Sequence, residues 1–455
     1  MSTLNQEIPE GYKQTEVGVI PEDWDCVTLG DLGDIVRGGS PRPAGDPKYF
    51  NGNYIPWLTV ASLTNIPTSK QEVTSTLTKL TELGSKQSRI LDAGTLIISN
   101  SGATLGVAKI LGLKCCANDG VAAIINQKKG NKSFITHYIN TQTKRLHDDV
   151  ATGNGQPNLN TDLIKLIPIP FPSESEQTVI ANALSDLDAL LTELEKLIAK
   201  KQAIKTATMQ QLLTGKTRLP QFATYTEGEK QGQLKGTKPS ELGEIPEDWD
   251  VQTVYELAEG QKSLFDDGDW IEAEYITDKG VRLIQTGNIG VGRYQEKENK
   301  KYISESSFIK LKCKELKQGD LLICRLAEPA GRACIFPDIG EEKIITSVDV
   351  TIFRPPVETV NREYLLHYFS TNEWFSSVLE QVGGTTHKRI SRGALGRIRV
   401  PMPKLAEQTA IATILSDMDN EIQTLEQRLA KTRQIKQGMM QELLTGRTRL
   451  PFEKE

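Results

Sequence analysis

The chain has 455 residues, of which 38% are hydrophobic and 25% charged, and its formal net charge is -5. This length exceeds what one hydrophobic core usually organises, so we expect two or three folded domains. The negative charge argues against strong nonspecific DNA binding, although it allows a local basic groove.

The chain opens with a polar stretch, residues 1–18, that lacks the apolar core of a signal peptide. No apolar run approaches the roughly 20 residues that span a bilayer, so we expect no contact with a membrane. The six cysteines form no C-x-x-C pair and show no zinc-like spacing. We therefore expect reduced thiols, no metal site and a cytoplasmic protein.

Residues 20–172 mix strand-like and helix-like runs, which predicts an α+β domain. Strands are expected at Leu96–Ser99 and Ala122–Ile125, and a helix at Phe134–Leu146. Between them lie polar, glycine-containing loops. Such loops are often only turns, but Arg, Asn and Gln pair with base edges, while Ser and Thr suit phosphates. The candidate DNA-binding residues of this region are Arg37, Ser40, Arg42, Asn100, Ser101, Thr104, Asn154, Gln156 and Asn158.

A long helix is predicted after the proline-rich end of this region. No Pro or Gly interrupts residues 174–213, Ser173 or Ser175 can cap the start, and Gly215 suits the stop. About 40 residues at ~1.5 Å each give a rod of roughly 60 Å. Apolar residues recur in steps of 4, 3, 4, 3 and 4, the period of a coiled coil, at Ile180, Leu184, Leu187, Leu191, Leu194 and Ile198.

The chain then repeats itself. Ile-Pro-Glu-Asp-Trp-Asp at residues 20–25 recurs at 245–250, an offset of 225 residues. Glu-Gln-Thr at 176–178 recurs at 407–409, and Leu-Leu-Thr-Gly at 212–215 recurs at 443–446, both at an offset of 231. The regions between these motifs look unrelated. Two similar frames holding different inserts are typical of a protein whose inserts read different things.

The second insert predicts another α+β domain over residues 245–403. Strands are expected at Leu321–Cys324 and Val350–Phe353, and a helix at Glu363–Glu380. Residues 387–399 hold five Lys or Arg and no acid. The candidate DNA-binding residues here are Lys262, Asn288, Arg325, Arg332, Thr385, Thr386, His387, Lys388 and Arg389.

The second long helix repeats the steps of the first, and Gly446 suits its stop. Its predicted coiled-coil residues are Ile411, Leu415, Met418, Ile422, Leu425 and Leu429. Two copies related by a pseudo-two-fold axis pair antiparallel, so we expect each helix to be the other's partner and a spacer between the domains. An ordinary two-helix core without a spacer role is the alternative. The Lys and Arg residues on these helices suit a solvated face, DNA phosphates or a partner subunit.

No catalytic machinery is evident, so we predict no catalytic residues. The sequence lacks an Asn-Pro-Pro-Tyr methyltransferase motif. Gly215-Lys216-Thr217 resembles the end of a phosphate loop, but position 210 is Gln rather than Gly. The histidines at 137, 147, 367 and 387 form no metal pair. A solitary nuclease is therefore disfavoured, and a protein–protein adaptor leaves the dissimilar inserts without a reason.

The whole chain resembles the specificity subunits of type I restriction–modification systems. The resemblance rests on proline-rich strands that lead into Glu-Gln helix starts, at 169–177 and 400–408. It also rests on short motifs: Gly-Gly-Ser-Pro-Arg at 38–42, Ala-Gly-Thr-Leu at 93–96, Gly-Asp-Leu-Leu at 319–322 and Gly-Gly-Thr-Thr at 383–386. Two features depart from it. Thr-Gly-Asn-Gly at 152–155 replaces a Gly-Gly-Thr-like loop, and residues 37–42 have no clear equivalent in the second copy.

The resemblance implies a non-catalytic, bacterial or archaeal protein that binds double-stranded DNA. Each domain is expected to read half of an interrupted site, while the helices set the spacer and dock two modification (methyltransferase) subunits. Restriction subunits that translocate and cut DNA complete the complex. S-adenosylmethionine, ATP and Mg are expected on these partners, with no cofactor in this chain.

The predicted fold is accordingly α+β, with two mixed α/β target-recognition domains separated by two long antiparallel coiled-coil helices. The predicted boundaries are a first domain at 1–172, a first helix at 173–214, a linker at 215–243, a second domain at 244–403, a second helix at 404–445 and a tail at 446–455.

Overall fold

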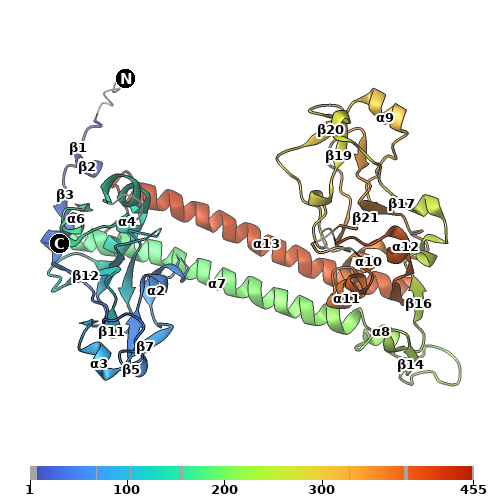
Figure 1. Cartoon of the computed structure of the whole chain (residues 1–455), viewed down its shortest axis with the longest axis horizontal. Coiled ribbons are helices and arrows are strands. Elements are labelled where there is room, and N and C mark those ends of the chain that lie inside the picture. Colours follow the sequence, from blue (N-terminus) through green and yellow to red (C-terminus); the bar gives the residue numbers. More distant parts are fainter. Residues whose placement is uncertain are drawn as a thin grey trace. The chain divides into compact units, whose positions relative to one another are not determined.

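The computed structural model describes residues 8–67, 69–102, 104–152, 157–326, 328–383 and 388–452 (Figure 1). The chain forms two compact units. One comprises Met1–Ile198 with Leu425–Glu455, and the other Ala199–Thr424. Each unit therefore contains one predicted α+β region and a part of both long helices. The predicted boundaries between domains and helices do not coincide with this division.

The first unit is an α+β domain with two main sheets, of strand order β4-β12-β9-β10-β6 and β7-β5-β11-β8. Its strands are β1 (Tyr12–Thr15), β2 (Gly18–Pro21), β3 (Asp25–Thr28), β4 (Asp34–Arg37), β5 (Phe50–Leu58), β6 (Glu72–Val73), β7 (Thr78–Leu80), β8 (Arg89–Leu91), β9 (Leu96–Ser99), β10 (Ala108–Leu111), β11 (Cys115–Ala117), β12 (Val121–Ile125) and β13 (Pro168–Phe171). Its helices are α1 (Leu29–Leu32), α2 (Val60–Thr64), α3 (Glu82–Ser85), α4 (Lys132–Thr141), α5 (Thr143–Arg145), η1 (Leu146–Val150), α6 (Thr161–Lys165) and the first part of α7 (Glu174–Leu212).

The second unit repeats this plan, with sheets β17-β24-β21-β22 and β18-β20-β19-β23. Its strands are β14 (Thr237–Ser240), β15 (Gly243–Pro246), β16 (Asp250–Thr253), β17 (Phe265–Asp267), β18 (Ile276–Thr277), β19 (Val281–Ile284), β20 (Lys301–Ile303), β21 (Leu321–Cys324), β22 (Ala333–Ile335), β23 (Ile344–Thr346), β24 (Val350–Phe353) and β25 (Arg399–Met402). Its helices are α8 (Pro220–Ala223), η2 (Glu256–Ala258), η3 (Lys262–Leu264), η4 (Ala273–Tyr275), η5 (Thr286–Asn288), α9 (Glu305–Leu311), α10 (Arg362–Tyr368), α11 (Asn372–Glu380), α12 (Arg392–Arg397) and the first part of α13 (Leu405–Leu443).

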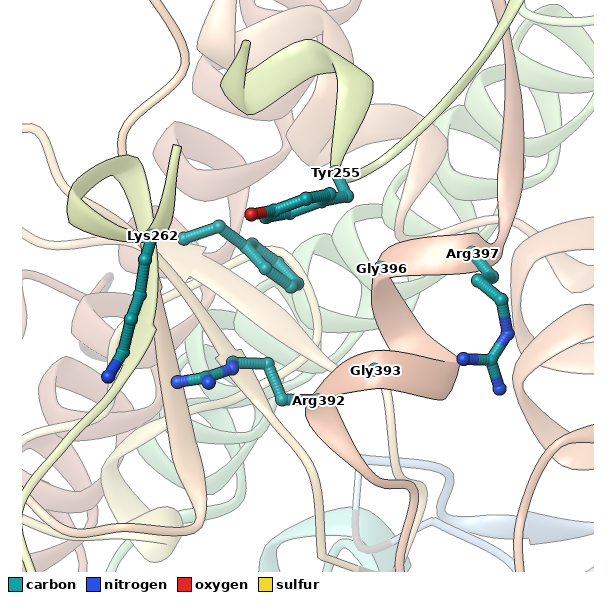
Figure 2. A pocket seen from close by; sticks show the side chains of 7 residues that line it. Tyr255, Lys262, Arg392, Gly393, Gly396 and Arg397 are labelled. Atoms are coloured by element: carbon teal, nitrogen blue, oxygen red, sulfur yellow. The ribbon is translucent and has the colours of Figure 1, made fainter. Parts of the chain in front are cut away.

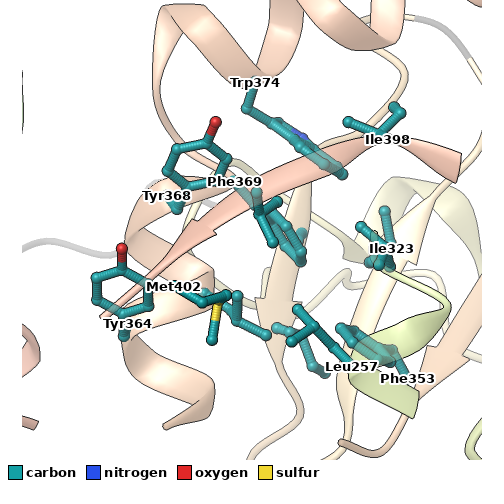
Figure 3. Close-up of a cluster of buried hydrophobic side chains, with 14 of the residues drawn as sticks. Leu257, Ile323, Phe353, Tyr364, Tyr368, Phe369, Trp374, Ile398 and Met402 are labelled. Carbon is teal, nitrogen blue, oxygen red and sulfur yellow. The ribbon is translucent and has the colours of Figure 1, made fainter. Parts of the chain in front are cut away.

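The strands predicted from apolar runs are confirmed, because β9, β12, β21 and β24 lie at those positions as central, buried strands. The predicted helix at Glu363–Glu380 is divided into α10 and α11. The break follows from Thr371, whose side chain caps α11 by accepting a hydrogen bond from the Trp374 amide. Trp374 then stacks on Phe369 with ring centroids 4.1 Å apart. Both rings belong to the main core of the second unit (Figure 3).

The long helices begin and end where the sequence predicted, within one or two residues. Ser173 accepts a hydrogen bond from the Glu176 amide, as expected of a cap. In the first unit, Asp188 and Glu195 of α7 pair with Lys436 and Arg433 of α13. The residue number of the partner in α13 falls as the residue number in α7 rises, so the two helices are antiparallel in this unit. In the second unit, Lys201 and Lys205 pair with Glu421 and Asp419, with the same polarity.

The periodic apolar residues have two kinds of partner. Ile180 and Leu184 lie in the core cluster of the first domain, and Ile411 and Leu415 in that of the second. The start of each helix is therefore part of its own domain. Of the remaining predicted coiled-coil residues, Leu191, Leu194, Ile198 and Ile422 are buried, and Leu187, Met418, Leu425 and Leu429 are half-buried.

A cluster of four side chains, which we call the first frame cluster, joins the C-terminal residues to the first domain. Arg449 donates to both carboxylate oxygens of Glu176, at 2.7 Å each, and also pairs with Asp23 at 2.9 Å. The indole of Trp24 donates to the same Glu176 carboxylate at 3.0 Å. Residues 446–452 are therefore an integral part of the first unit rather than a tail.

The second frame cluster repeats this arrangement with the residues that the sequence assigned to a linker. Arg218 donates to both oxygens of Glu407 at 2.7 Å and to Asp248 at 2.8 Å, while Trp249 donates to Glu407 at 3.1 Å. Gly215 has a φ of +71°, and a Cβ there would lie 2.4 Å from Pro246. Only glycine allows this close approach. Residues 237–246 add the hairpin β14–β15, so the predicted linker is folded.

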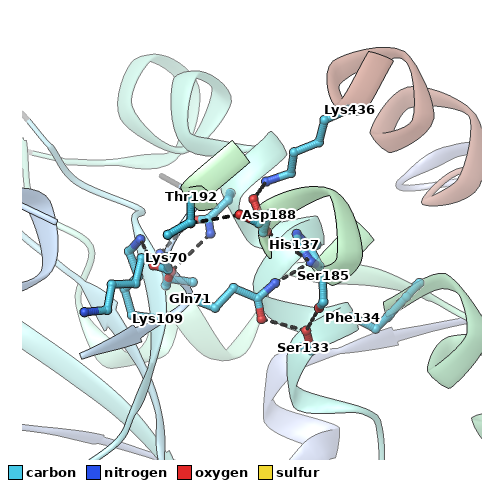
Figure 4. A network of polar contacts seen from close by, with 12 residues as sticks. Lys70, Gln71, Lys109, Ser133, Phe134, His137, Ser185, Asp188, Thr192 and Lys436 are labelled. Carbon is cyan, nitrogen blue, oxygen red and sulfur yellow. Dashed lines mark hydrogen bonds and ion pairs between the residues drawn. The ribbon is translucent and has the colours of Figure 1, made fainter. Parts of the chain in front are cut away.

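A separate polar cluster lies between the first domain and the long helices α7 and α13 (Figure 4). Asp188 pairs with Lys436, its other oxygen is 3.9 Å from the His137 ring, and that ring contacts the Gln71 amide. Burial lowers the pKa of His137 to about 3, with the Lys436 charge adding to the effect, and burial raises the pKa of Asp188. Burial also lowers the pKa of nearby Lys109 to about 8.

The second unit holds a counterpart of this histidine. His367 lies 3.2 Å from the Ser416 hydroxyl and 3.9 Å from Asp419, which pairs with Lys205. Burial and the Lys205 charge lower the pKa of His367 to about 4, against the opposing effect of Asp419. Both histidines are therefore held neutral.

Within the described residues, the helices lack the long apolar stretch that a membrane span requires.

The first frame cluster predicts that Arg449→Ala destabilises the chain by about 3 kcal/mol, because the buried Glu176 carboxylate loses its bidentate partner. Thermal and urea unfolding of the full chain measure this loss. Arg447→Ala is the matched control, since the exposed Arg447 side chain makes no ion pair within the described residues, and we expect little change. Equal stabilities of the two variants would contradict the structural role.

The two neutral histidines predict a loss of stability in acid. Their folded pKa values lie below the unfolded value of about 6.5, so the unfolded chain binds more protons as the pH falls. Above pH 6.5 these two histidines leave the free energy of unfolding at its full value. Below pH 6.5 the free energy of unfolding decreases, by about 2 kcal/mol per histidine at pH 5. Urea unfolding at pH 7 and pH 5 should show a smaller difference for His137→Gln/His367→Gln than for wild type. His147→Gln, which replaces a partly exposed histidine, should behave as wild type.

Candidate nucleic-acid interface

In the first domain, loops from distant parts of the sequence meet around Asp119, in the turn before β12. Ser40 donates to its carboxylate at 2.6 Å, and Arg42 pairs with it at 3.3 Å. The main-chain carbonyl of Asp119 accepts from Arg37 at 2.5 Å and from Asn100 at 3.3 Å. The hydrogen bond from Ser40 is the main cause that lowers the pKa of Asp119. Four predicted residues are thus brought together, and we call this set the first loop edge.

Part of the first loop edge is free to contact a ligand. The Arg42 side chain is 72% exposed, and a surface ion pair of this kind contributes little stability, so a phosphate or base can replace Asp119 at small cost. Ser101, next to Asn100, forms a backbone bridge with Asn158 that adds a third predicted loop, and Thr104 of the Asn100 loop is exposed. Asn100 is different because it is buried and supports the edge from within.

The structure adds a segment that the sequence reading missed. Arg89 donates to the Arg37 carbonyl at 2.8 Å. Lys86, Gln87 and Arg89 lie with Arg37 around an open groove of about 700 Å³. Their spacing carries no motif, and only the antiparallel pairing of β8 with β11, which sets Arg89 opposite Ala117, places the region near the first loop edge.

In the second domain, the corresponding loops meet around Asp349, in the turn before β24. Arg389 lies 2.9 Å from the Asp349 carboxylate, and its backbone bridges to Leu326 and Gly383. Lys388 beside it is exposed. We call these residues the second loop edge. The predicted residues Asn154, Gln156, Thr385, Thr386 and His387 lie outside the described residues.

Three predicted DNA contacts in the second domain have side chains that are already engaged inside it. Asn288 is buried and bonds the Gln285 amide and the Gln295 carbonyl. Arg325 is buried, lies 3.0 Å from Asp267, and donates to two backbone carbonyls. Arg332 donates to four backbone carbonyls around its loop. In this arrangement their polar groups are engaged within the domain and hold the loops in shape, and their role as DNA contacts stays a prediction.

The segment after β4, which has no evident counterpart in the sequence, has one in the structure. Gly38 donates to the Val121 carbonyl at the start of β12, and Gly268 donates to Val350 at the start of β24. A Cβ at either glycine would lie less than 2.5 Å from a backbone carbonyl oxygen. Residues 268–272 therefore follow β17 as residues 38–42 follow β4, but their side chains share no pattern.

Two α+β domains of one plan, each with a polar loop edge, agree with a comparison to known families. The sequence profile of the family described as type I restriction modification DNA specificity domain matches residues 21–206 and 246–434. The chain belongs to this family.

Relatives of this specificity family match over nearly the full length. The type I restriction enzyme MjaVIII specificity subunit of Methanocaldococcus jannaschii is 26% identical, with 97% of this chain and 96% of the relative covered. The putative MjaX specificity subunit of the same organism is 25% identical, with 97% of each covered. The solved S subunit of a type I system from M. genitalium has a TM-score of 0.55 at 13% identity, covering 95% and 96%. That similarity supports the fold.

One pocket lies beside the predicted residue Lys262. It measures about 400 Å³ and lies in the second domain, where it is lined by the aromatic side chains of Tyr255 and Phe265 and by Lys262, Arg392 and Arg397 (Figure 2). Gly396 makes room for it, since a Cβ there would meet Tyr255 at 3.3 Å. In the first domain the small and the large residue change places. Gly30 stands where the second domain has Tyr255, and it faces Lys165, which stands where the second domain has Gly396. The predicted Lys262 is exposed at this pocket. Within the described residues, no group of His, Cys, Asp and Glu side chains is arranged to hold a metal.

Proposed function

We propose that this chain is the DNA specificity subunit of a type I restriction–modification complex, and that each domain reads one half of a bipartite site. The observation that carries the proposal is the pair of loop edges. Each edge is built on the turn before the equivalent central strand of its domain, at Asp119 before β12 and at Asp349 before β24. The two edges nevertheless present different side chains. Equal frames with unequal edges suit two different half-sites.

The chemistry of the exposed residues fits double-stranded DNA. Arg42, Arg389 and Lys388 offer cationic donors on loops, whereas the net charge of the whole chain is negative. Positive charge on these loops of a chain with a negative net charge favours binding there over nonspecific binding along the whole surface. Arginine also pairs with guanine in the major groove. Arg42 and Arg389 are therefore our candidates for base or phosphate contacts.

We assign the chain no catalytic step. Methylation and cleavage would be carried out by two modification subunits and by restriction subunits, which would hold S-adenosylmethionine, ATP and Mg. The long helices would dock the modification subunits and set the unread spacer. The complex would act on DNA in the cytoplasm of a bacterial or archaeal cell.

Methylation mapping tests the specificity role directly. The chain is co-expressed with its modification subunit, and adenine methylation is mapped across genomic DNA by long-read sequencing. We expect one bipartite motif that disappears when this chain is omitted. A stable complex that methylates no motif would contradict the proposal and leave the helices as a protein-binding adaptor.

The spacer role predicts that deleting one heptad from each helix, residues 193–199 and 424–430, shortens the spacer without changing either half-site. Seven residues correspond to about 10 Å of helix, so the expected change is at most about 3 base pairs. The deletion preserves the phase of the apolar repeat. The methylated motif of the variant complex reports both quantities. Insertion of a heptad at the same places should lengthen the spacer, and altered half-sites with an unchanged spacer would contradict a ruler.

A further inference from the structure

Trp270 occupies a special place in the second domain. Gly268 and Gly38 are equivalent, as described above, and the next residues continue the match. Gly39 donates to Ala117 at the end of β11, and Asp269 donates to Thr346 at the end of β23. Two residues beyond each glycine stand Ser40 and Trp270. Trp270 thus takes the position of a residue that lies in the first loop edge.

The exposure of Trp270 is unusual in this chain. Its side chain is 67% exposed. The other tryptophans are at most 7% exposed and form parts of cores or frame clusters: Trp24, Trp57, Trp249 and Trp374. A large aromatic surface left in water is typical of a contact site.

The backbone that carries Trp270 is held in place. The Asp269 carboxylate accepts a hydrogen bond from the Lys314 amide at 2.7 Å, and Asp269 bridges to Ser347 in the turn that leads to Asp349. A Cβ on Gly268 would lie 2.3 Å from the Ser347 carbonyl, so the chain runs tightly against that turn. The indole is therefore presented from a fixed position beside the second loop edge.

The three aspartates that precede Trp270 are paired with cations. Asp266 and Asp269 lie within 4 Å of Lys314, and Arg392 pairs with Asp266 and Asp267. Lys314 and Arg392 are engaged by these carboxylates, so this position is poorly suited to binding phosphates. An indole there suits the apolar base edges of the major groove instead, such as the thymine methyl group.

We propose that Trp270 contacts the bases of the half-site read by the second domain, and that it is a specificity-determining residue whose counterpart in the first domain is the polar Ser40. This inference rests on the proposed function. Its contribution is apolar, so it adds to affinity without changing the dependence of binding on salt.

Fluorescence tests the contact. The complete complex with its modification subunits is prepared as wild type and as Trp270→Phe, and the difference between their spectra isolates Trp270. Adding DNA with the mapped bipartite motif should shift this difference signal and protect it from acrylamide. DNA in which only the second half-site is scrambled should do neither. An unchanged signal while anisotropy of labelled DNA reports binding would overturn the inference. A shift caused by the modification subunit before DNA is added would overturn it as well, by assigning Trp270 to a protein contact.

Substitution tests the specificity. Trp270→Ala should weaken binding of the cognate site about tenfold and relax the methylated motif in the second half-site only, with an unchanged slope of log affinity against log salt. Lys388→Ala should instead reduce that slope. Ile309→Ala is the matched control, because Ile309 is 72% exposed on α9, and it should leave the motif unchanged. An unaltered motif in Trp270→Ala overturns the inference, whereas the absence of any bipartite motif in wild type overturns the proposed function itself.

Discussion

A buried carboxylate at the start of each long helix is the interaction on which the rest of the structure depends. Glu176 and Glu407 each receive two hydrogen bonds from an arginine and one from a tryptophan indole. An unpaired carboxylate in this position would be costly, so all the partners must be present together. In each unit the carboxylate and its partners come from three separate segments. One pair of charges therefore joins the domain, the start of one helix and the residues beyond the end of the other.

This arrangement explains why the compact units do not follow the order of the chain. The first unit is completed by residues 446–452, and the second by residues 215–246, which follow the end of α7. Both segments carry the same Thr-Arg-Leu-Pro sequence, at 217–220 and 448–451. Residues 446–452 complete the first domain although they follow the second domain in the chain. Residues 215–246 complete the second domain although they follow the first domain and its helix. A segment that looks like a linker in the sequence can thus be structural.

The loop edges are largely independent of these frame clusters. Asp119 and Asp349 lie in turns before central strands, and the side chains that bond or pair with them come from loops that tolerate different residues. The same strand plan therefore supports Ser40 in one copy and Trp270 in the other. The exchange of Gly30 and Lys165 for Tyr255 and Gly396 shows the same principle. A change of volume on one element is matched by the opposite change on its neighbour, so the frame persists while the surface differs.

The sequence by itself determined the duplicated plan, the extent of both helices and the central strands, because these depend on local periodicity and on motifs such as those at 20–25 and 176–178. Family membership followed from the same motifs. Only the tertiary structure decided that residues 215–243 and 446–452 are folded parts of the units, because an arginine reveals nothing of a partner some 190 to 270 residues away. It also separated exposed Arg42 and Lys388 from buried Asn288 and Arg325, since burial depends on packing that composition does not encode. The match between residues 38–42 and 268–272 likewise rests on backbone hydrogen bonds, to which side-chain identity contributes nothing.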